Sequence, residues 1–233
     1  MNYIFLDEVQ RVADFQKAVD ALYIKKNCDV YITGSNAYLL SGELATLLSG
    51  RYVEIKMLPL SFKEYVQARG ESLETDRLYQ DYIHNSSFPY ALELSGPKDI
   101  RQYLDGIYNS IIVKDIITRR RIGDVDMLKS VARFLFDNIG NMVSSKKIAD
   151  TMTSAGRKIS VHTVENYLEA LTESFIFYQA GRYDIKGKQY LKNGGKYYAA
   201  DIGLCYYVLG TKRADAGHIL ENIVYLELLR RGY

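Results

Sequence analysis

Two adjacent carboxylates near the start of the chain have the types and spacing that catalysis needs. Asp7 and Glu8 directly follow the apolar run at residues 3–6, which is typical of a buried strand. At the tip of such a strand, the first acid can hold the ligand shell of a Mg²⁺ ion while the second orients an attacking water molecule. The alternative is structural, because acids also follow a strand where they cap the next helix.

A second set of polar residues follows the next apolar run, at residues 30–33. Ser35 and Asn36 come after it, at the edge where a parallel sheet presents its ligands, and either side chain could sense a terminal phosphate. Arg51 follows Gly50 further along and could reach the phosphate oxygens of its own nucleotide or of a neighbouring subunit's nucleotide. The alternative for Arg51 is an ordinary surface arginine.

Short apolar runs separated by helical patterns must position these side chains. The pattern predicts buried parallel strands at 3–6, 30–33 and 52–57, with helices around 12–22 and 39–48. The opening segment is therefore expected to be α/β. All three prolines lie between residues 59 and 97, and they divide this segment from a helical remainder.

The remainder of the chain has the element order of a winged helix. A helical pattern runs from residue 100 to the arginines at 119–121, and a new unit starts near residue 124. Three helices are expected at 127–138, 145–152 and 161–174, with Ser144 or Ser145 and Ser160 as N-caps. Strands at 175–178 and 197–200 follow, and the last helix spans 217–233.

The third of these helices does not suit reading of a DNA major groove. Its exposed side carries acids rather than cations, namely His162, Glu165, Asn166, Glu169 and Glu173, and would repel phosphate. The expected wing is basic, with five cations against Asp184 alone: Arg182, Lys186, Lys188, Lys192 and Lys196. A sequence-independent DNA contact through the wing and a protein contact, including one with a second copy of the chain, both stay open.

Composition excludes several classes of protein. The 233 residues carry a formal net charge of +2, too small to indicate nucleic acid or an anionic membrane as partner of the whole molecule. Two cysteines and three dispersed histidines form neither a disulfide scaffold nor a metal-binding cluster. The sequence has no secretory signal and no apolar stretch of membrane-spanning length, so we expect a cytoplasmic protein.

Four short motifs follow one another near the N-terminus: FLDEVQ at 5–10, ITGSN at 32–36, LSGRY at 48–52 and PLSFKEY at 59–65. In order and spacing they resemble the P-loop ATPases of the AAA+ type found in bacteria and archaea, in which a C-terminal region of unknown function follows the ATPase core. The resemblance implies ATP and Mg²⁺ as cofactors. It implies that Asp7 coordinates Mg²⁺, Glu8 activates water, Ser35 or Asn36 acts as a sensor and Arg51 contacts the nucleotide.

The chain departs from this family in one respect. A P-loop ATPase holds phosphates with G-x-x-x-x-G-K-[ST], and no such motif occurs in the 233 residues. We therefore expect a fragment that starts within an ATPase core, neither binds ATP tightly nor hydrolyses it alone, and associates through exposed apolar surface. The segment 218–233 resembles the first helix of a nuclease-like domain, with Glu221 as its acid. The alternative is a solvated helix with Glu221, Glu227, Arg230 and Arg231 on its wet face.

These patterns predict four parts. They are the later part of an AAA+ core at 1–70, a helical connector at 71–123, a winged-helix-like domain at 124–210 and the start of a nuclease-like domain at 211–233. The first expected function is ATP binding and hydrolysis coupled to movement of the C-terminal region. The second is a non-enzymatic module that binds a protein or DNA.

Overall fold

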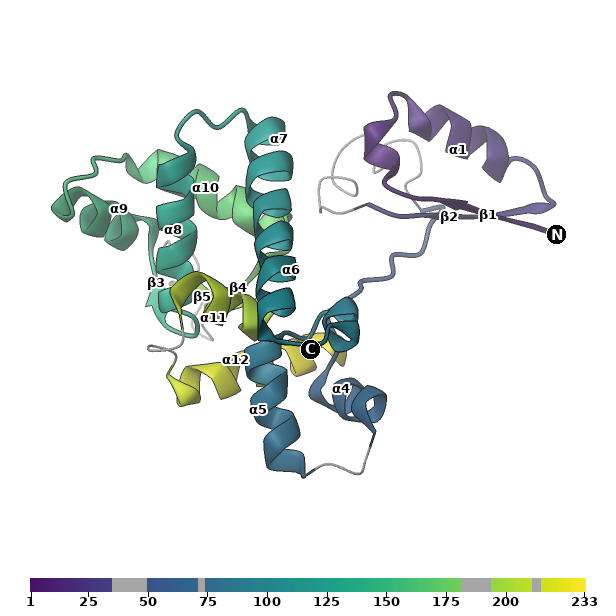
Figure 1. Cartoon of the computed structure of the whole chain (residues 1–233). Helices are drawn as coiled ribbons and strands as arrows, with labels where there is room; N and C mark the ends of the chain where they lie inside the picture. The colour runs from purple at the N-terminus through teal and green to yellow at the C-terminus, as the bar shows by residue number, and fades with distance from the viewer. Residues whose placement is uncertain (35–49, 71–73, 182–193, 211–214) are drawn as a thin grey trace, which may run out of the picture. The chain divides into compact units, whose positions relative to one another are not determined.

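The computed structural model of the chain describes residues 1–34, 50–70, 74–181, 194–210 and 215–233. It is a mixed α/β protein in which helices predominate, and it divides into two units (Figure 1). The first contains Met1–Lys56, and the second contains Met57–Thr172 and Ile176–Tyr233.

The first unit is built on two parallel strands. β1 (Asn2–Leu6) and β2 (Cys28–Ile32) pair in parallel, with Ile4 opposite Val30. The connection between them contains the 3₁₀ turn η1 (Val9–Arg11) and the helix α1 (Phe15–Tyr23). Val9 and Val19 are buried at the centre of a small apolar cluster. The predicted order of strand, helix and parallel strand is therefore confirmed, while the predicted helix at 39–48 lies outside the described residues.

The prediction that β1 is buried on both faces is wrong. Tyr3 is 62% exposed and Phe5 is 74% exposed. Leu6, Val30 and Ile32 pack against the Val9–Val19 cluster, so this cluster accounts for one side of the sheet only. On the other side, the ring of Phe5 stacks on Tyr31 at a centroid distance of 4.9 Å, and within the described residues no element covers these two rings well enough to bury them.

The predicted strand at 52–57 is also absent. The described residues 50–58 contain no strand, and Val53, Ile55 and Met57 are 89%, 72% and 84% exposed. Figure 1 shows this segment as a drawn-out stretch without helical turns. A strand forms only where a neighbour accepts and donates its backbone hydrogen bonds, and no described residue does so here.

The second unit begins with helices that the prolines help to start. Its first elements are α4 (Phe62–Arg69), α5 (Thr75–Asn85), η2 (Pro89–Glu93), α6 (Pro97–Asn109), the π-helical segment η3 (Ser110–Ile117) and α7 (Thr118–Arg120). Pro89 and Pro97 both occupy the first turn of their elements, where a missing N–H costs nothing. α6 runs without a break through η3 into α7 and ends at Arg121, whose φ is +50°.

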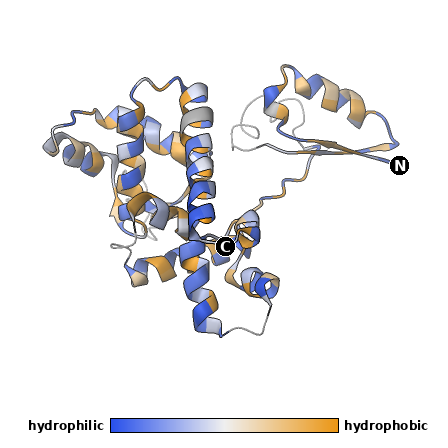
Figure 2. Ribbon diagram, in the orientation of Figure 1, coloured by the Kyte–Doolittle hydropathy of each residue, from blue (hydrophilic) through white to orange (hydrophobic). Residues whose placement is uncertain are grey.

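The remaining elements surround a small antiparallel sheet. They are α8 (Val125–Asp137), β3 (Met142–Val143), α9 (Ser145–Ser154), α10 (Val161–Glu173), β4 (Phe177–Gly181), β5 (Gly195–Ala199), α11 (Ile202–Leu209) and α12 (Ala216–Arg230). The strand order is β3-β5-β4. Phe136 of α8 and Phe177 of β4 meet in the core at 4.5 Å between ring centroids. Figure 2 shows apolar and polar positions interleaved along α8, as a half-buried helix requires.

The predicted helix starts in this unit are close to the observed ones. The Ser144 hydroxyl accepts from the N–H of Lys147 at 3.2 Å, and the Ser160 hydroxyl accepts from the N–H of Thr163 at 3.0 Å. The strand predicted at 175–178 begins later, at Phe177. Phe175 has φ of +57° and is 37% exposed, so the chain turns there before it becomes extended.

Candidate functional site

Asp7 and Thr33 meet at the carboxyl edge of the parallel strands. Asp7 follows β1, Thr33 follows β2, and the Thr33 hydroxyl donates to Asp7 Oδ1. The same hydroxyl oxygen accepts from the Glu8 N–H at 3.1 Å. Thr33 therefore joins both predicted acids through one atom.

The backbone explains why these residues meet. The Thr33 N–H donates to the Leu6 carbonyl at 2.9 Å, and the Val9 N–H donates to the Thr33 carbonyl at 3.2 Å. These bonds continue the parallel pairing beyond the last residues of both strands. The side chains that follow β1 and β2 are consequently held side by side.

Glu8 lies in a turn whose backbone is left-handed, with φ of +50° and ψ of +46°. Its carboxylate lies 3.9 Å from Arg11 Nε. The arginine side chain is 79% exposed, so this ion pair is weak.

Arg51 does not join the two acids. Its Nη1 lies 3.0 Å from Asp20 Oδ1, and its guanidinium lies 5.7 Å from the centre of the Tyr23 ring. Both partners belong to α1. The other predicted sensors, Ser35 and Asn36, lie outside the described residues. Sequence reasoning named these two and missed Thr33, although a polar residue at the end of the neighbouring strand was the signal for it.

The oxygen atoms at this edge fit a Mg²⁺ ion that takes most of its ligands from water and phosphate. A carboxylate and a hydroxyl are hard ligands, and Mg²⁺ commonly binds proteins through one or two carboxylates. Within the described ranges no three His, Cys, Asp or Glu side chains gather as a set that could hold a metal alone. The residues fit the phosphates of a nucleotide less well, because the 233 residues contain no phosphate-binding G-x-x-x-x-G-K-[ST] motif.

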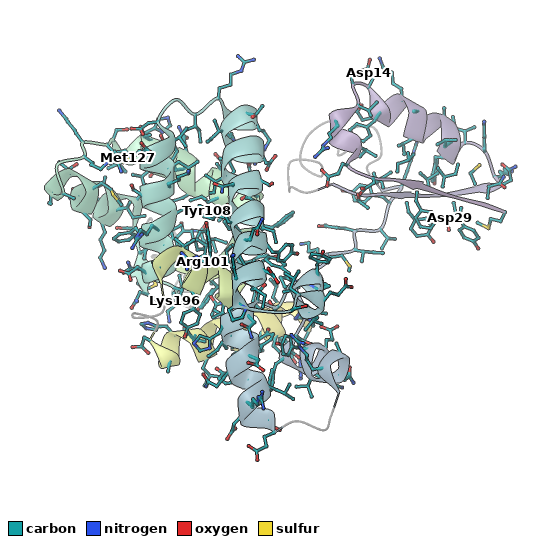
Figure 3. The ribbon with its side chains drawn as sticks, viewed as in Figure 1. Asp14, Asp29, Arg101, Tyr108, Met127 and Lys196 are labelled. Carbon is teal, nitrogen blue, oxygen red and sulfur yellow. The ribbon has the colours of Figure 1, made fainter. Side chains whose placement is uncertain are left out.

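Glu221 keeps 38% of its side chain exposed, as a solvated α12 predicts, but it is also hydrogen-bonded to two residues. Its Oε1 accepts from Lys196 Nζ and from the Tyr198 hydroxyl, both at 2.7 Å. The hydrogen bond from Lys196 and then the one from Tyr198 lower the pKa of Glu221. Of the five predicted wing cations, Lys196 (Figure 3) is thus already paired, and the other four lie outside the described residues.

The acids of α10 also have partners. Glu169 Oε2 lies 3.5 Å from Arg120 Nη2, and Glu165 accepts from the Ser145 hydroxyl at 3.2 Å. Arg120 of α7 therefore partly neutralises the helix face that was expected to repel phosphate, while Ser145 of α9 only hydrogen-bonds to it.

The side chain of Asn222 in α12 makes the hydrogen bonds to β5 that a neighbouring strand would make. Its side-chain oxygen accepts from the Ala199 N–H at 2.8 Å, and its amide donates to the Ala199 carbonyl at 2.9 Å. β3 pairs only with residues 195 and 196 of β5, so Ala199 lies beyond its reach. Asn222 is fully buried, and its amide supplies the two bonds of the absent neighbour.

A buried carboxylate joins two distant turns. Asp201 accepts at 2.6 Å from both the N–H and the hydroxyl of Ser87, at 3.2 Å from the Ser86 hydroxyl and at 2.7 Å from the Leu204 N–H. Burial raises the pKa of Asp201, and the hydrogen bonds from Ser87 oppose that shift. An acid before an apolar run signals a helix N-cap, but nothing local in the sequence signals the two serines 114 and 115 residues away.

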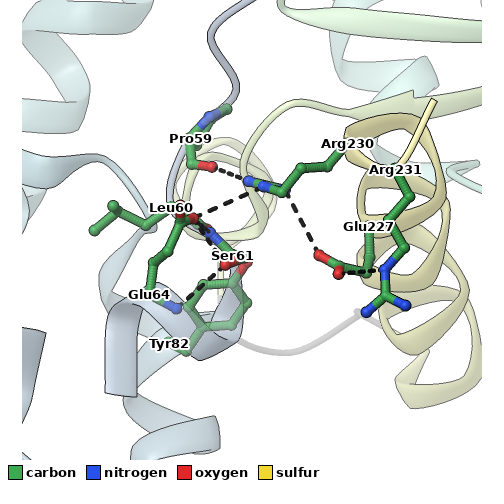
Figure 4. Close-up of polar contacts among 8 residues, drawn as sticks. All are labelled: Pro59, Leu60, Ser61, Glu64, Tyr82, Glu227, Arg230 and Arg231. Atoms are coloured by element: carbon green, nitrogen blue, oxygen red, sulfur yellow. Dashed lines mark hydrogen bonds and ion pairs between the residues drawn. The ribbon is translucent and has the colours of Figure 1, made fainter. Parts of the chain in front are cut away.

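Arg230 ties α12 to the start of the second unit, and Figure 4 draws these contacts. The guanidinium donates to the Pro59 carbonyl and lies 3.7 Å from Glu64 Oε2. Glu64 also accepts from the Ser61 N–H at 2.7 Å, which closes a capping box at the start of α4 and lowers the pKa of Glu64. Arg230, placed on a wet face by the sequence, is thus three-quarters buried.

Comparison with known proteins gives two family matches. Residues 1–66 match an AAA domain, and residues 76–215 match a domain of unknown function, DUF8612. Among the helices in the described residues, none has the length and apolar character needed to cross a membrane.

Two relatives cover nearly the whole chain. An uncharacterized protein of Haemophilus influenzae is 48% identical over 234 residues, which is 99% of this chain and 58% of that protein. An uncharacterized protein of Methanocaldococcus jannaschii is 31% identical over 245 residues, which is 99% of this chain and 53% of that protein. The chain thus spans a little more than half the length of these curated relatives.

Proposed function

Because the chain belongs to the family of the domain of unknown function DUF8612, and its first 66 residues match an AAA domain, we propose that it is part of an ATP-binding protein of the AAA type. The observation that carries the proposal is the junction of Asp7, Glu8 and Thr33 at the carboxyl edge of the parallel strands. Ligands of α/β sheets bind at such edges.

Each residue of the junction has a role in this proposal. Asp7, oriented by the Thr33 hydroxyl, provides a carboxylate oxygen for the Mg²⁺ shell. Glu8 leaves Arg11, accepts a hydrogen bond from the attacking water and orients it. When bound, Mg²⁺ neutralises charge that develops on the phosphate oxygens. Arg51, with Ser35 or Asn36, contacts the phosphates, which requires Arg51 to leave Asp20.

We assign the phosphate-binding loop to polypeptide outside these 233 residues. The absence of G-x-x-x-x-G-K-[ST] from the sequence and the greater length of both relatives support this division. The whole protein would couple ATP binding and hydrolysis to movement of the C-terminal region. Its division at residues 70, 123 and 210, and the nuclease-like character of 211–233, stay predictions.

Mn²⁺ binding tests the metal-binding half of the proposal. Mn²⁺ replaces Mg²⁺ and loses its free electron paramagnetic resonance signal when bound. We expect the chain to reduce the free signal and the Asp7→Asn variant to restore it. Asp29→Asn is the matched control, because Asp29 lies on the same sheet and accepts from the Tyr31 hydroxyl at 3.0 Å. Equal Mn²⁺ binding by the wild type and Asp7→Asn would overturn the assignment.

Calorimetric titration of the chain with ATP and Mg²⁺ tests the nucleotide-binding half of the proposal. We expect no saturable heat from this chain and no magnesium-dependent turnover, because the phosphates are held elsewhere. The Asp7→Ala, Glu8→Gln double variant is the control. Saturable heat that disappears in this variant would mean that the described edge holds the phosphates by itself, and the divided site would be abandoned.

A second candidate function is a winged-helix interaction module. The order α8, β3, α9, α10, β4, β5 and the strand order β3-β5-β4 support a winged helix, whose predicted wing lies mostly outside the described residues. The pairing of Lys196 with Glu221 leaves one fewer cation for DNA and so favours a protein partner. Reversing Lys186, Lys188 and Lys192 to Glu tests this. Loss of salt-sensitive DNA retention, unchanged in Lys98→Glu, would favour DNA instead.

A further inference from the structure

The long helix that begins with α6 contains one wide stretch. α6, η3 and α7 follow one another without a break, and η3 has π-helical winding over eight residues, Ser110–Ile117 (Figure 1). A π-helical bond joins residue i to residue i+5 rather than i+4, so a π-helical turn holds one residue more than an α-helical turn. The Ile122 N–H extends this pattern, because it donates to the Ile117 carbonyl at 3.2 Å. The helix therefore contains a surplus residue in η3.

The isoleucines of η3 suit both kinds of winding. In π-helical winding, residues five apart share a face, as Ile111 and Ile116 do. In α-helical winding, residues four apart share a face, as Ile112 and Ile116 do. Ile112 and Ile116 are fully buried, and Ile111 and Ile117 pack against the same core. Apolar burial thus does not restrict η3 to one winding, which is a condition for an element with two states.

We propose that η3 is a two-state joint, in which the wide π-helical form tightens to α-helix and passes its surplus residue into the turn after α7. One residue of an α-helix corresponds to about 100° of rotation, so tightening turns α7 by about that angle relative to α6. The turn can take up a residue, because Arg121 and Gly123 are exposed and Arg121 already has a left-handed backbone. The joint lies within the second unit and does not depend on the nucleotide site.

An ion pair to α10 depends on the state of the joint. Arg120 of α7 lies 3.5 Å from Glu169, and the two side chains are 33% and 59% exposed. An exposed pair of this kind contributes little to stability, so it holds the wide form only weakly. Rotation of α7 by about 100° carries Arg120 away from Glu169. The winding of η3 therefore decides whether Arg120 neutralises Glu169 on the exposed face of α10, and so regulates the charge that this face offers to a partner.

Single-residue deletions test whether η3 contains a surplus residue. Deletion of Lys114, near the middle of η3, should leave cooperative urea unfolding with a midpoint at least as high as that of the wild type. Deletion of Arg133 from α8 is the matched control, because buried Val131 and Leu135 lie on either side of it and no wide turn can absorb the loss. This control should lower the midpoint strongly or abolish cooperative unfolding. Equal damage by the two deletions would overturn the proposal.

Pulsed electron paramagnetic resonance distances in the full chain detect the two forms. Nitroxides are attached at Thr118→Cys in α7 and Asn166→Cys in α10, both exposed, in a Cys28→Ser background in which the remaining Cys205 is buried. We expect two distance populations in this protein. Deletion of Lys114 gives an α-helical η3 with no residue to pass on, so only the distance of the wide form should remain. Lys114→Ala keeps the length of the helix and should keep both populations.

Variants of the ion pair test its link to the joint. Glu169→Lys places two cations together and should raise the population of the tight form about two- to fivefold, as the loss of an exposed ion pair would. The double variant Arg120→Glu, Glu169→Lys restores opposite charges and should return the populations to the wild-type ratio. A single population without any deletion, two populations after deletion of Lys114, or an unchanged ratio in Glu169→Lys would each overturn the proposal.

Discussion

Thr33 donates its hydroxyl hydrogen to Asp7, so the residues that follow two neighbouring strands are joined side chain to side chain. The parallel register, with Leu6 opposite Ile32, brings them to the same edge. A carboxylate held in this way keeps one orientation before any ligand arrives. Preorganisation of this kind distinguishes a binding edge from a pair of acids that merely caps a helix.

Thr33→Val should weaken Mn²⁺ binding about tenfold, which is the usual effect of removing a residue that orients a metal ligand. Valine keeps the shape of threonine and removes the hydroxyl. Thr33→Ser, which keeps the hydroxyl, is expected to bind like the wild type. The measurement is the same free Mn²⁺ signal, and equal affinities in all three proteins would contradict an orienting role.

Gly203→Ala should destabilise the second unit by about 1–3 kcal/mol, because the added methyl group meets backbone rather than space. A Cβ at this position would lie 2.5 Å from the Ser86 nitrogen. Gly106 of α6 has nothing within 4 Å of such a Cβ, so Gly106→Ala should instead stabilise by about 0.5–1 kcal/mol. Urea unfolding followed by tyrosine fluorescence compares the two, and shifts of the same sign would refute the argument.

Asn222→Ala is expected to cost about 2–4 kcal/mol, because it leaves both the N–H and the carbonyl of Ala199 buried without partners. Asn166, exposed on α10, provides a matched control, and its replacement by alanine should change the free energy of unfolding little. Hydrogen exchange at the Ala199 amide gives an independent measurement. Unchanged protection of that amide in Asn222→Ala would rule out the strand-like role.

Glu221 should make stability depend on pH in a defined direction. Its pKa is lowered in the folded protein, chiefly by the hydrogen bond from Lys196, so the ionised carboxylate stabilises the fold above the ordinary value of 4.5. This contribution is lost as the pH falls through the lowered pKa. The free energy of unfolding of Glu221→Gln should therefore lie below that of the wild type at neutral pH and approach it under acidic conditions. A gap that widens on acidification would contradict the assignment.

The helices of the second unit were predictable because their signals are local. Ser144 and Ser160 bond to N–H groups three residues ahead, so the sequence alone locates those helix starts. The alternating pattern at 52–57 failed because strand formation depends on a neighbour that the pattern does not contain. The apolar pattern likewise could not predict that one side of β1 is exposed, because burial depends on which elements pack against the strand.

The candidate site was predictable in part for the same reason. Asp7 and Glu8 follow an apolar run and were identified directly, whereas Thr33 acquires its role from the parallel register. The partners of Asp201, Asn222 and Arg230 lie 114, 23 and 171 residues away along the chain. Contacts of this range arise from the packed fold, and no local pattern encodes them.

The contact between Arg230 and Pro59 has a consequence for biosynthesis. Pro59 is synthesised long before α12. Until α12 leaves the ribosome, the carbonyls of Pro59 and Ala199 therefore lack their hydrogen-bond partners Arg230 and Asn222. Folding that depends on such distant contacts is slow, because the chain loses the entropy of loop closure before the contacts form and stabilise it. The second unit is therefore expected to fold after release of its last helix rather than progressively during synthesis, and chaperones would have their longest opportunity to bind it in that interval.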